Sequence, residues 1–147
     1  MAGTRVWQCL DQHYSDRLKK DVSLIELECG LCVPCMIAAQ MGAKVVLTDQ
    51  PSLLLQLQQN IQDNFHIPYN LQNQHSHQKA SNPYQIRAKP LSWSRYALQI
   101  HLTSLQNIHQ FDFILNCDCV VEPLYGDSWK LLVEVIDELL PIHPQKY

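Results

Sequence analysis

The sequence predicts one α/β domain whose mostly parallel sheet is covered by helices on both faces. Strand-like apolar runs alternate along the 147 residues with segments in which apolar residues recur at helical spacing. The composition, 46% hydrophobic and 17% charged, is that of one globular domain with one core. Right-handed crossovers between successive strands leave few topologies open for such a chain.

The first half of the chain contains a strand, loop, helix and strand in succession. Residues 24–27 form an apolar run, and the loop after them opens a helix that has Pro34 in its first turn. Gly42 is suited to the end of that helix. A second strand is predicted over residues 44–49, where β-branched and apolar residues end at an acidic side chain. This order is typical of a βαβ unit.

The next segment contains a second helix and then a polar stretch. Pro51 suits the start of the helix, and a single apolar stripe runs along it before Asn64. The stripe consists of Leu54, Leu57 and Ile61. Residues 65–83 are rich in Gln, Asn, His and Ser without apolar periodicity, which predicts a polar, flexible surface insertion.

The last third continues the alternation of strands and helices. We predict a third strand within residues 84–93, a short helix over 98–105 and a fourth strand over 111–118. A final helix follows, with Asp127 or Ser128 as its N-cap and one apolar face. That face consists of Trp129, Leu132, Val133, Ile136 and Leu140.

Polar and loop residues gather where the predicted strands end. Ligands of open parallel sheets bind at the carboxyl ends of the strands, which here are residues 28–32, Asp49, 91–93 and 117–118. A loop before a helix, followed by an acidic residue at the end of the next strand, outlines a nucleotide-type site. Gly30 alone remains of a G-x-G-x-x-G pattern, so the loop by itself is a weak motif.

Four ordered motifs resemble one family. Residues 24–49, LIELECGLCVPCMIAAQMGAKVVLTD, resemble the E-L-G-x-G-T-G-L-P segment, helix and strand of the seven-strand protein-lysine methyltransferases, methyltransferase family 16. Residues 3–7 resemble its G-x-x-V-W segment, 90–93 its L-D-W element and 116–121 its D-x-x-Y element. The resemblance implies a Rossmann-like, doubly wound fold and S-adenosylmethionine as cofactor.

The resemblance also implies roles for single residues. The implied cofactor-binding residues are Trp7, Glu28, Cys29, Gly30, Asp49, Trp93 and Cys117. Residues 28–30 would line the methionine end, Asp49 would hold the ribose, and Trp93 with Cys117 would flank the adenine. Asp118 would lie near the methyl group and the target lysine of a protein substrate, as the candidate catalytic residue. The implied reaction is direct displacement by a lysine amine, which depends on alignment and involves no metal.

Several departures from the family pattern predict weakened cofactor binding and reduced or absent activity. Glu28 and Cys32 stand where the family loop has glycines, whose lack of a side chain permits close approach and positive φ. Val121 stands in place of the family tyrosine. The chain ends at Tyr147 where family members continue through three more strands, so we expect 1–147 to be one partial, truncated domain. Its fourth strand would then leave an open edge suited to a partner chain.

Two other classes of protein compete with this interpretation. One is a non-catalytic interaction protein that retains the fold, in which Trp7 and Trp93 pack in the core and Asp49 or Asp118 cap helices. The other is a zinc or iron–sulfur protein, because Cys29, Cys32 and Cys35, with Cys117 or Cys119, could supply four thiolates. Neither the ferredoxin nor the zinc-ribbon pattern is complete.

The composition argues against some classes of binding partner and some cellular locations. The net charge of −3 gives no reason to expect binding to nucleic acid or to an acidic membrane surface. No apolar run reaches the roughly 20 residues that a membrane-spanning helix needs, and residues 1–10 do not resemble a signal peptide. We therefore predict a cytoplasmic protein whose six cysteines are free thiols.

Overall fold

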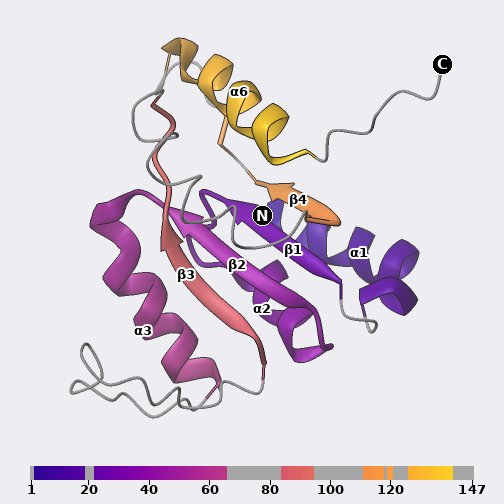
Figure 1. Ribbon diagram of the computed structural model, residues 1–147. Coiled ribbons are helices and arrows are strands. Elements are labelled where there is room, and N and C mark those ends of the chain that lie inside the picture. Colours follow the sequence, from indigo (N-terminus) through magenta and orange to yellow (C-terminus); the bar gives the residue numbers. More distant parts are fainter. Residues whose placement is uncertain are drawn as a thin grey trace, which may run out of the picture.

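The computed structural model contains one sheet of four parallel strands. It describes residues 2–18, 22–65, 84–94, 111–117, 119–120 and 126–140. The strands are β1 Ser23–Leu27, β2 Lys44–Asp49, β3 Ile86–Pro90 and β4 Phe113–Asn116, in the spatial order β3-β2-β1-β4 (Figure 1). The parallel α/β fold is therefore confirmed. The predicted helix over 98–105, residues 66–83 and Asp118 lie outside the described residues.

The described helices lie where the sequence predicts them, except that the helix at the amino end was not predicted. They are α1 Ala2–Leu18, α2 Val33–Gln40, α3 Leu54–Phe65 after a 3-10 turn at Pro51–Leu53, and α6 Trp129–Leu139 after one at Gly126–Ser128. Ser128 is the N-cap of α6 but makes no side-chain capping bond. The predicted buried face of the last helix is wrong in part, because Leu132, Val135 and Leu139 are buried while Trp129, Val133 and Leu140 are exposed. Among the described residues, no helix combines the length and apolarity needed to cross a membrane.

Two differences from the prediction have simple physical causes. We did not predict α1, although apolar side chains recur every four residues along it and lie on its packed side: Val6, Leu10, Tyr14 and Leu18. Helix α3 extends through Phe65, which we had assigned to the polar insertion. That ring is only 6% exposed and packs against Tyr84, so its burial continues the helix by one residue.

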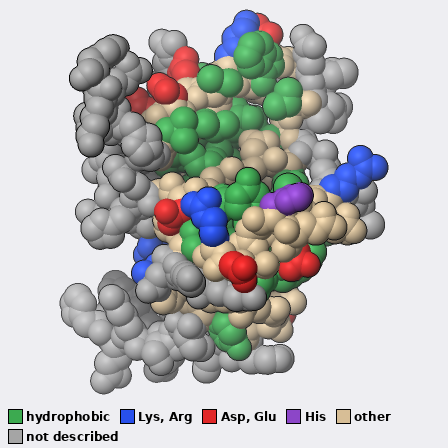
Figure 2. All heavy atoms as spheres, turned by 90° about the vertical axis from the view of Figure 1, so that its right-hand side faces the viewer, with side chains coloured by type: hydrophobic (Ala, Val, Ile, Leu, Met, Phe, Trp, Pro, Cys, Tyr) green, Lys and Arg blue, Asp and Glu red, His purple; other side chains and the backbone are tan. Residues whose placement is uncertain are grey.

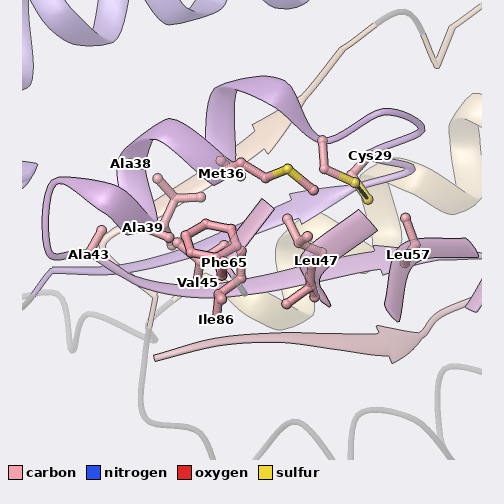
Figure 3. Close-up of a cluster of buried hydrophobic side chains, with 14 of the residues drawn as sticks. Cys29, Met36, Ala38, Ala39, Ala43, Val45, Leu47, Leu57, Phe65 and Ile86 are labelled. Carbon is pink, nitrogen blue, oxygen red and sulfur yellow. Dashed lines mark hydrogen bonds between the residues drawn. The ribbon is translucent and has the colours of Figure 1, made fainter. Parts of the chain in front are cut away.

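Side chains alternate between the two faces of the sheet and form two core clusters. On β1, Leu24 belongs to the cluster that also contains residues of α1, α2 and α3, drawn in part in Figure 3. Its neighbour Ile25 belongs to the cluster that contains Leu132, Val135 and Leu139 of α6. Helices thus cover both faces, as the doubly wound prediction requires.

The central strands are buried and the edge strands are not. All residues of β1 after Ser23 and all of β2 after Lys44 are buried, whereas every residue of β4 is partly exposed. Helix α1 shields one face of β4, because Tyr14 packs edge-on against Phe113 and the Arg17 guanidinium lies 5.1 Å from the centre of that ring. Figure 2 shows the molecule from the right-hand side of Figure 1, and hydrophobic side chains gather on the upper part of that side.

Hydrogen bonds hold the amino ends of β1 and β4 together. The Ser23 N–H and hydroxyl both donate to Asp112 Oδ2, at 2.8 and 2.9 Å, and the Asp112 N–H donates to the Ser23 carbonyl at 2.8 Å. The backbone N–H of Ser23 has the largest effect and lowers the pKa of Asp112; burial opposes it, and the Ser23 hydroxyl and the Arg17 charge lower the pKa further. This closed amino end leaves the carboxyl ends of the strands as the place for a ligand.

Candidate functional site

The carboxyl ends of β1, β2 and β3 converge on Asp49. The Gly30 N–H donates to Asp49 Oδ2 at 3.1 Å, and the Leu91 N–H donates to the Asp49 carbonyl at 2.8 Å. The Cys29 N–H donates to the carbonyl of Thr48 at 3.0 Å. The loop after β1, the end of β2 and the segment after β3 therefore meet at one acidic residue.

Asp49 is positioned by the backbone and retains unused hydrogen-bonding capacity. Its side chain is buried at 5% exposure, and Oδ1 accepts the Gln50 N–H at 2.8 Å. Among the described residues, each carboxylate oxygen therefore accepts one backbone hydrogen bond, while an ionised carboxylate has roughly four acceptor positions. Asp49 does not cap the following turn, whose N-cap is Gln50. The free positions suit the two hydroxyls of a ribose.

The loop after β1 keeps a backbone shape that glycine adopts most easily. Glu28, Gly30 and Cys32 all have positive φ, of 50°, 51° and 59°. A non-glycine residue in this left-handed region costs about 1–2 kcal/mol. A Cβ atom added at Gly30 would meet nothing within 4 Å, so the space beside this backbone is open. The loop thus retains its conformation although two of its three left-handed residues are not glycine.

The first turn of α2 adds a second polar feature beside the loop. Its N-cap residue, Cys32, makes no side-chain capping bond, and the first turn contains no acidic residue. Backbone N–H groups at a helix start carry partial positive charge and attract carboxylates. Gly3 of α1 lies against this turn, since a Cβ added there would be 3.5 Å from Cγ of Pro34.

Acidic side chains give the site a negative character. Burial first, and then the nearby charge of Asp49, raises the pKa of Glu28. Glu26 of β1 is 1% exposed, and burial raises its pKa to about 7 despite a hydrogen bond with the Cys35 thiol that lowers it. Its Oε2 has no hydrogen-bond partner in the described part of the chain. Acids beside Asp49 favour a cationic ligand over an anionic one.

Glu26 is the feature of this region that our sequence analysis missed. We had included it in an apolar strand run, and the signal was available: a carboxylate flanked on both sides by residues that a central strand buries. Buried carboxylates with raised pKa values are enriched at functional sites.

The two tryptophans assigned to the cofactor lie in different clusters. Trp93 is half-buried against the cluster beneath α6, and its Nε1 is buried without a hydrogen-bond partner among the described residues. Trp7 is half-buried against the cluster shared by α1, α2 and α3. Trp93 therefore follows the strand end that Asp49 holds, whereas Trp7 packs on the other face of the sheet. Cys117 follows β4 and is half-buried.

The buried thiols make contacts other than a metal site. Cys29 and Cys32 contact each other with their sulfur atoms 2.7 Å apart, and the Cys35 thiol faces Glu26. The Cys119 thiol lies 3.5 Å from the Leu27 carbonyl. Within the residues that the structure describes, no group of three or more His, Cys, Asp or Glu side chains is placed to hold a metal ion.

The geometry defines a class of protein first. The chain has a Rossmann-like fold, with a parallel sheet covered by helices on both faces, a left-handed loop after β1 and an acidic residue at the end of β2. Residues 6–147 match the family described as lysine methyltransferase. The chain therefore belongs to the lysine methyltransferase family, and its recognition from the sequence motifs is confirmed.

The chain is similar to two proteins that are longer than it is. It is 37% identical over 114 residues to secreted RxLR effector protein 48 of Plasmopara viticola, a match that covers 77% of this chain and 54% of the relative. It is 27% identical over 100 residues to methyltransferase-like protein 23 of Dictyostelium discoideum, covering 66% of this chain and 36% of the relative. The chain thus spans about half or less of the curated relatives that it matches.

Proposed function

We propose that this protein transfers a methyl group from S-adenosylmethionine to a lysine of a protein substrate. One observation carries the proposal: Asp49 joins the Gly30 loop to the segment that leads to Trp93, at the carboxyl ends of adjacent parallel strands. Membership of the lysine methyltransferase family supports both the cofactor and the substrate class.

The residues present fit the cofactor in shape and charge. Open carboxylate positions on Asp49 suit ribose hydroxyls, and the open space at Gly30 suits close approach of a ligand to the backbone. Trp93 Nε1, which has no hydrogen-bond partner among the described residues, can donate to a ligand beside that ring. Glu28 offers a carboxylate beside the loop, where a sulfonium or an ammonium group needs negative charge. When bound, the cofactor supplies a methyl group on a positively charged sulfur.

The protein's own contribution is mainly alignment. We propose that Asp49 and the Gly30 loop fix the position of the nucleoside, with Trp93 and Cys117 beside the base and Trp7 against the cofactor. Glu28 and Cys29 then border the methionine end. Asp118 is proposed to orient the incoming lysine amine, which must be neutral to act as a nucleophile. Such alignment can supply much of the acceleration without a dedicated base.

A non-catalytic protein that retains the fold is the second candidate. Glu28 and Cys32 favour it, because their left-handed backbone places bulky side chains in a loop where the family has glycine. Both candidates keep the same sheet, so only ligand binding and methyl transfer separate them. The proposals of a cytoplasmic location and of a partner chain along β4 apply to either candidate.

Calorimetric titration with S-adenosylmethionine tests the cofactor assignment. We expect binding by the wild-type chain and a large loss of affinity in Asp49→Ala, whereas the exposed Asp63→Ala should behave like the wild type. No heat and no competition at roughly millimolar ligand, an interaction below about 4 kcal/mol, would remove the enzyme hypothesis.

Methyl transfer tests the reaction and the accepting residue. A protein extract would be incubated with the enzyme and cofactor labelled in its methyl group, then hydrolysed to amino acids. We expect label in methylated lysine, lost with Asp49→Ala. Label in methylated arginine would contradict the lysine assignment, and cofactor binding without any transfer would favour the non-catalytic candidate.

A further inference from the structure

A pair of thiols in the loop after β1, one of them Cys29 at the proposed methionine end, has chemistry that the proposed methyl transfer does not use. We propose that Cys29 and Cys32 form a redox-active dithiol that a hydroperoxide converts reversibly into an intramolecular disulfide. This modification site depends on the loop geometry alone, so it holds whether or not the protein is a methyltransferase.

The backbone turn brings the two sulfur atoms close together. Cys29 and Cys32 flank a tight turn that is closed by a hydrogen bond of 2.8 Å from the Cys32 N–H to the Cys29 carbonyl. Their sulfur atoms are 2.7 Å apart, and a disulfide bond of about 2.05 Å requires only a small further approach. The ends of such a turn lie within about 7 Å, which overlaps the Cα separations that disulfides span.

The other cysteines of the site are directed elsewhere. The Cys35 thiol is hydrogen-bonded to Glu26 and fully buried, and the Cys119 thiol faces the carbonyls of Leu27 and Cys117. Cys29 is therefore paired with Cys32 by contact. Figure 3 shows Cys29 at one end of the buried cluster, with the side chain of Met36 extending toward it.

The pair lies directly beneath an exposed loop tip. Cys29 and Cys32 are 8% and 1% exposed, but Leu31 between them is 71% exposed and Gly30 is exposed as well. A small hydroperoxide needs only a local opening of this loop to reach the sulfur atoms. The hydrogen bond with Cys32, followed by burial, raises the pKa of Cys29, so the opening of the loop also serves to release a thiolate.

The reaction balances with hydrogen peroxide as oxidant. The first sulfur of the pair to react attacks one peroxide oxygen, the O–O bond breaks, and the other oxygen leaves as water with the proton of that thiol, which leaves a sulfenic acid. The sulfur of the second thiol then attacks the sulfenic sulfur, and the S–O bond breaks. The hydroxyl departs as a second water with the proton of the second thiol. Two thiols lose two electrons and two protons, and the peroxide is reduced to two waters.

Peptide mapping after graded hydrogen peroxide tests the proposal. Remaining thiols would be alkylated, and the peptide that contains Cys29 and Cys32 would be weighed before and after dithiothreitol. We expect it to lose two hydrogen masses, to take up alkylating label at Cys35 alone, and to take up two further labels after reduction. Cys9, exposed on α1, is the internal comparison.

Variants separate the dithiol from general oxidation. Cys32→Gly removes one thiol while suiting a backbone with φ of 59°, and it should abolish the two-hydrogen loss. Cys29→Ala should do the same and replaces it if the first variant does not fold. Cys9→Ser should leave the loss intact. The proposal is overturned if both thiols stay reduced while Cys9 is oxidised, or if either cysteine becomes a sulfinic acid without a disulfide.

Discussion

The two strands that build the candidate site end in different ways. β2 ends at Asp49, whose residue type and hydrogen bonds both suit a ribose-binding position. β1 ends in a loop whose backbone is left-handed at Glu28 and Cys32, but whose side chains are not the glycines that make this shape inexpensive. The comparison teaches that non-glycine residues can hold left-handed backbone where a strand and a helix on either side fix the path of the loop.

The difference between the two strand ends also predicts opposite effects of substitutions on the free energy of unfolding. At the end of β2 the backbone N–H groups of Gly30 and Gln50 depend on the Asp49 carboxylate, so a change there removes bonds. In the loop after β1, changes toward glycine remove strain. The first kind of substitution should destabilise and the second should stabilise, and the following predictions break or sharpen this contrast from the largest effect to the smallest.

Asp49→Ala should have the largest effect. It removes a carboxylate that accepts two backbone bonds, and bonds to charged groups contribute about 1.5–3 kcal/mol each. We expect a loss of at least about 3 kcal/mol in the free energy of unfolding, measured in urea, together with a fall of more than about 100-fold in cofactor affinity. Asp63→Ala should change neither, and an Asp49→Ala protein with wild-type affinity would refute the role of this residue.

Glu26→Gln should change how stability depends on pH. Burial raises the Glu26 pKa from 4.5 to about 7 in the folded state, so the native protein holds this proton more strongly than the unfolded chain. Its stabilising contribution is full below about pH 4.5 and is lost as the pH rises to about 7, a change of about 3 kcal/mol. The glutamine variant should lack this decline.

Urea unfolding at several pH values between these limits measures the effect. The exposed Glu138→Gln on α6 is the matched control and should follow the wild-type curve. A Glu26→Gln curve parallel to the wild type would show that the carboxyl is not protonated in the folded protein.

Glu28→Gly should stabilise the protein. Relief of a left-handed non-glycine residue gains about 1–2 kcal/mol, and the added freedom of glycine in the unfolded chain offsets about half of it. We expect a gain of about 0.5–1 kcal/mol in urea unfolding. Cys32→Gly should gain less than Glu28→Gly, because it also removes a buried thiol from the core. Gly30→Ala should lose about 1 kcal/mol, since φ there is 51° although the Cβ has free space. Equal signs for Glu28→Gly and Gly30→Ala would contradict the strain.

Asp112→Asn should have the smallest effect, at the end of the sheet remote from the site. Ser23 donates to this carboxylate from its N–H and its hydroxyl, and the exposed position limits the loss to about 1 kcal/mol. The lowered Asp112 pKa makes this stabilisation present at neutral pH and lost as the pH falls through the folded-state pKa. Cofactor affinity should be unchanged, and a change would show that the two ends of the sheet are coupled.

Local patterns in the sequence were sufficient for the framework of the fold. The strand over 44–49, Pro34 near the start of α2 and the stripe along α3 all follow from periodicity and turn chemistry. Apolar residues also recur every four residues along α1. We did not predict this helix, because residues 3–7 were compared only with the family's G-x-x-V-W segment.

Features that depend on tertiary contacts could not be predicted in the same way. The sequence does not show that Glu26 faces Cys35 beneath the loop, since this requires α2 to be packed on β1. The contact between Cys29 and Cys32 depends on the turn conformation, and the placement of Trp7 and Trp93 on opposite faces depends on which helices cover the sheet. The roles of Asp118 and Cys117 stay predictions.

Hydrogen–deuterium exchange with and without S-adenosylmethionine tests the central claim most directly, because it reports where a ligand is bound. We predict slower exchange at the amides of residues 28–32, 49–50 and 91–93 when the cofactor is present, and no change at residues 22–24 at the amino end of the sheet. Binding with unchanged exchange in those three segments, or with protection confined to other parts of the chain, would contradict a cofactor site built around Asp49.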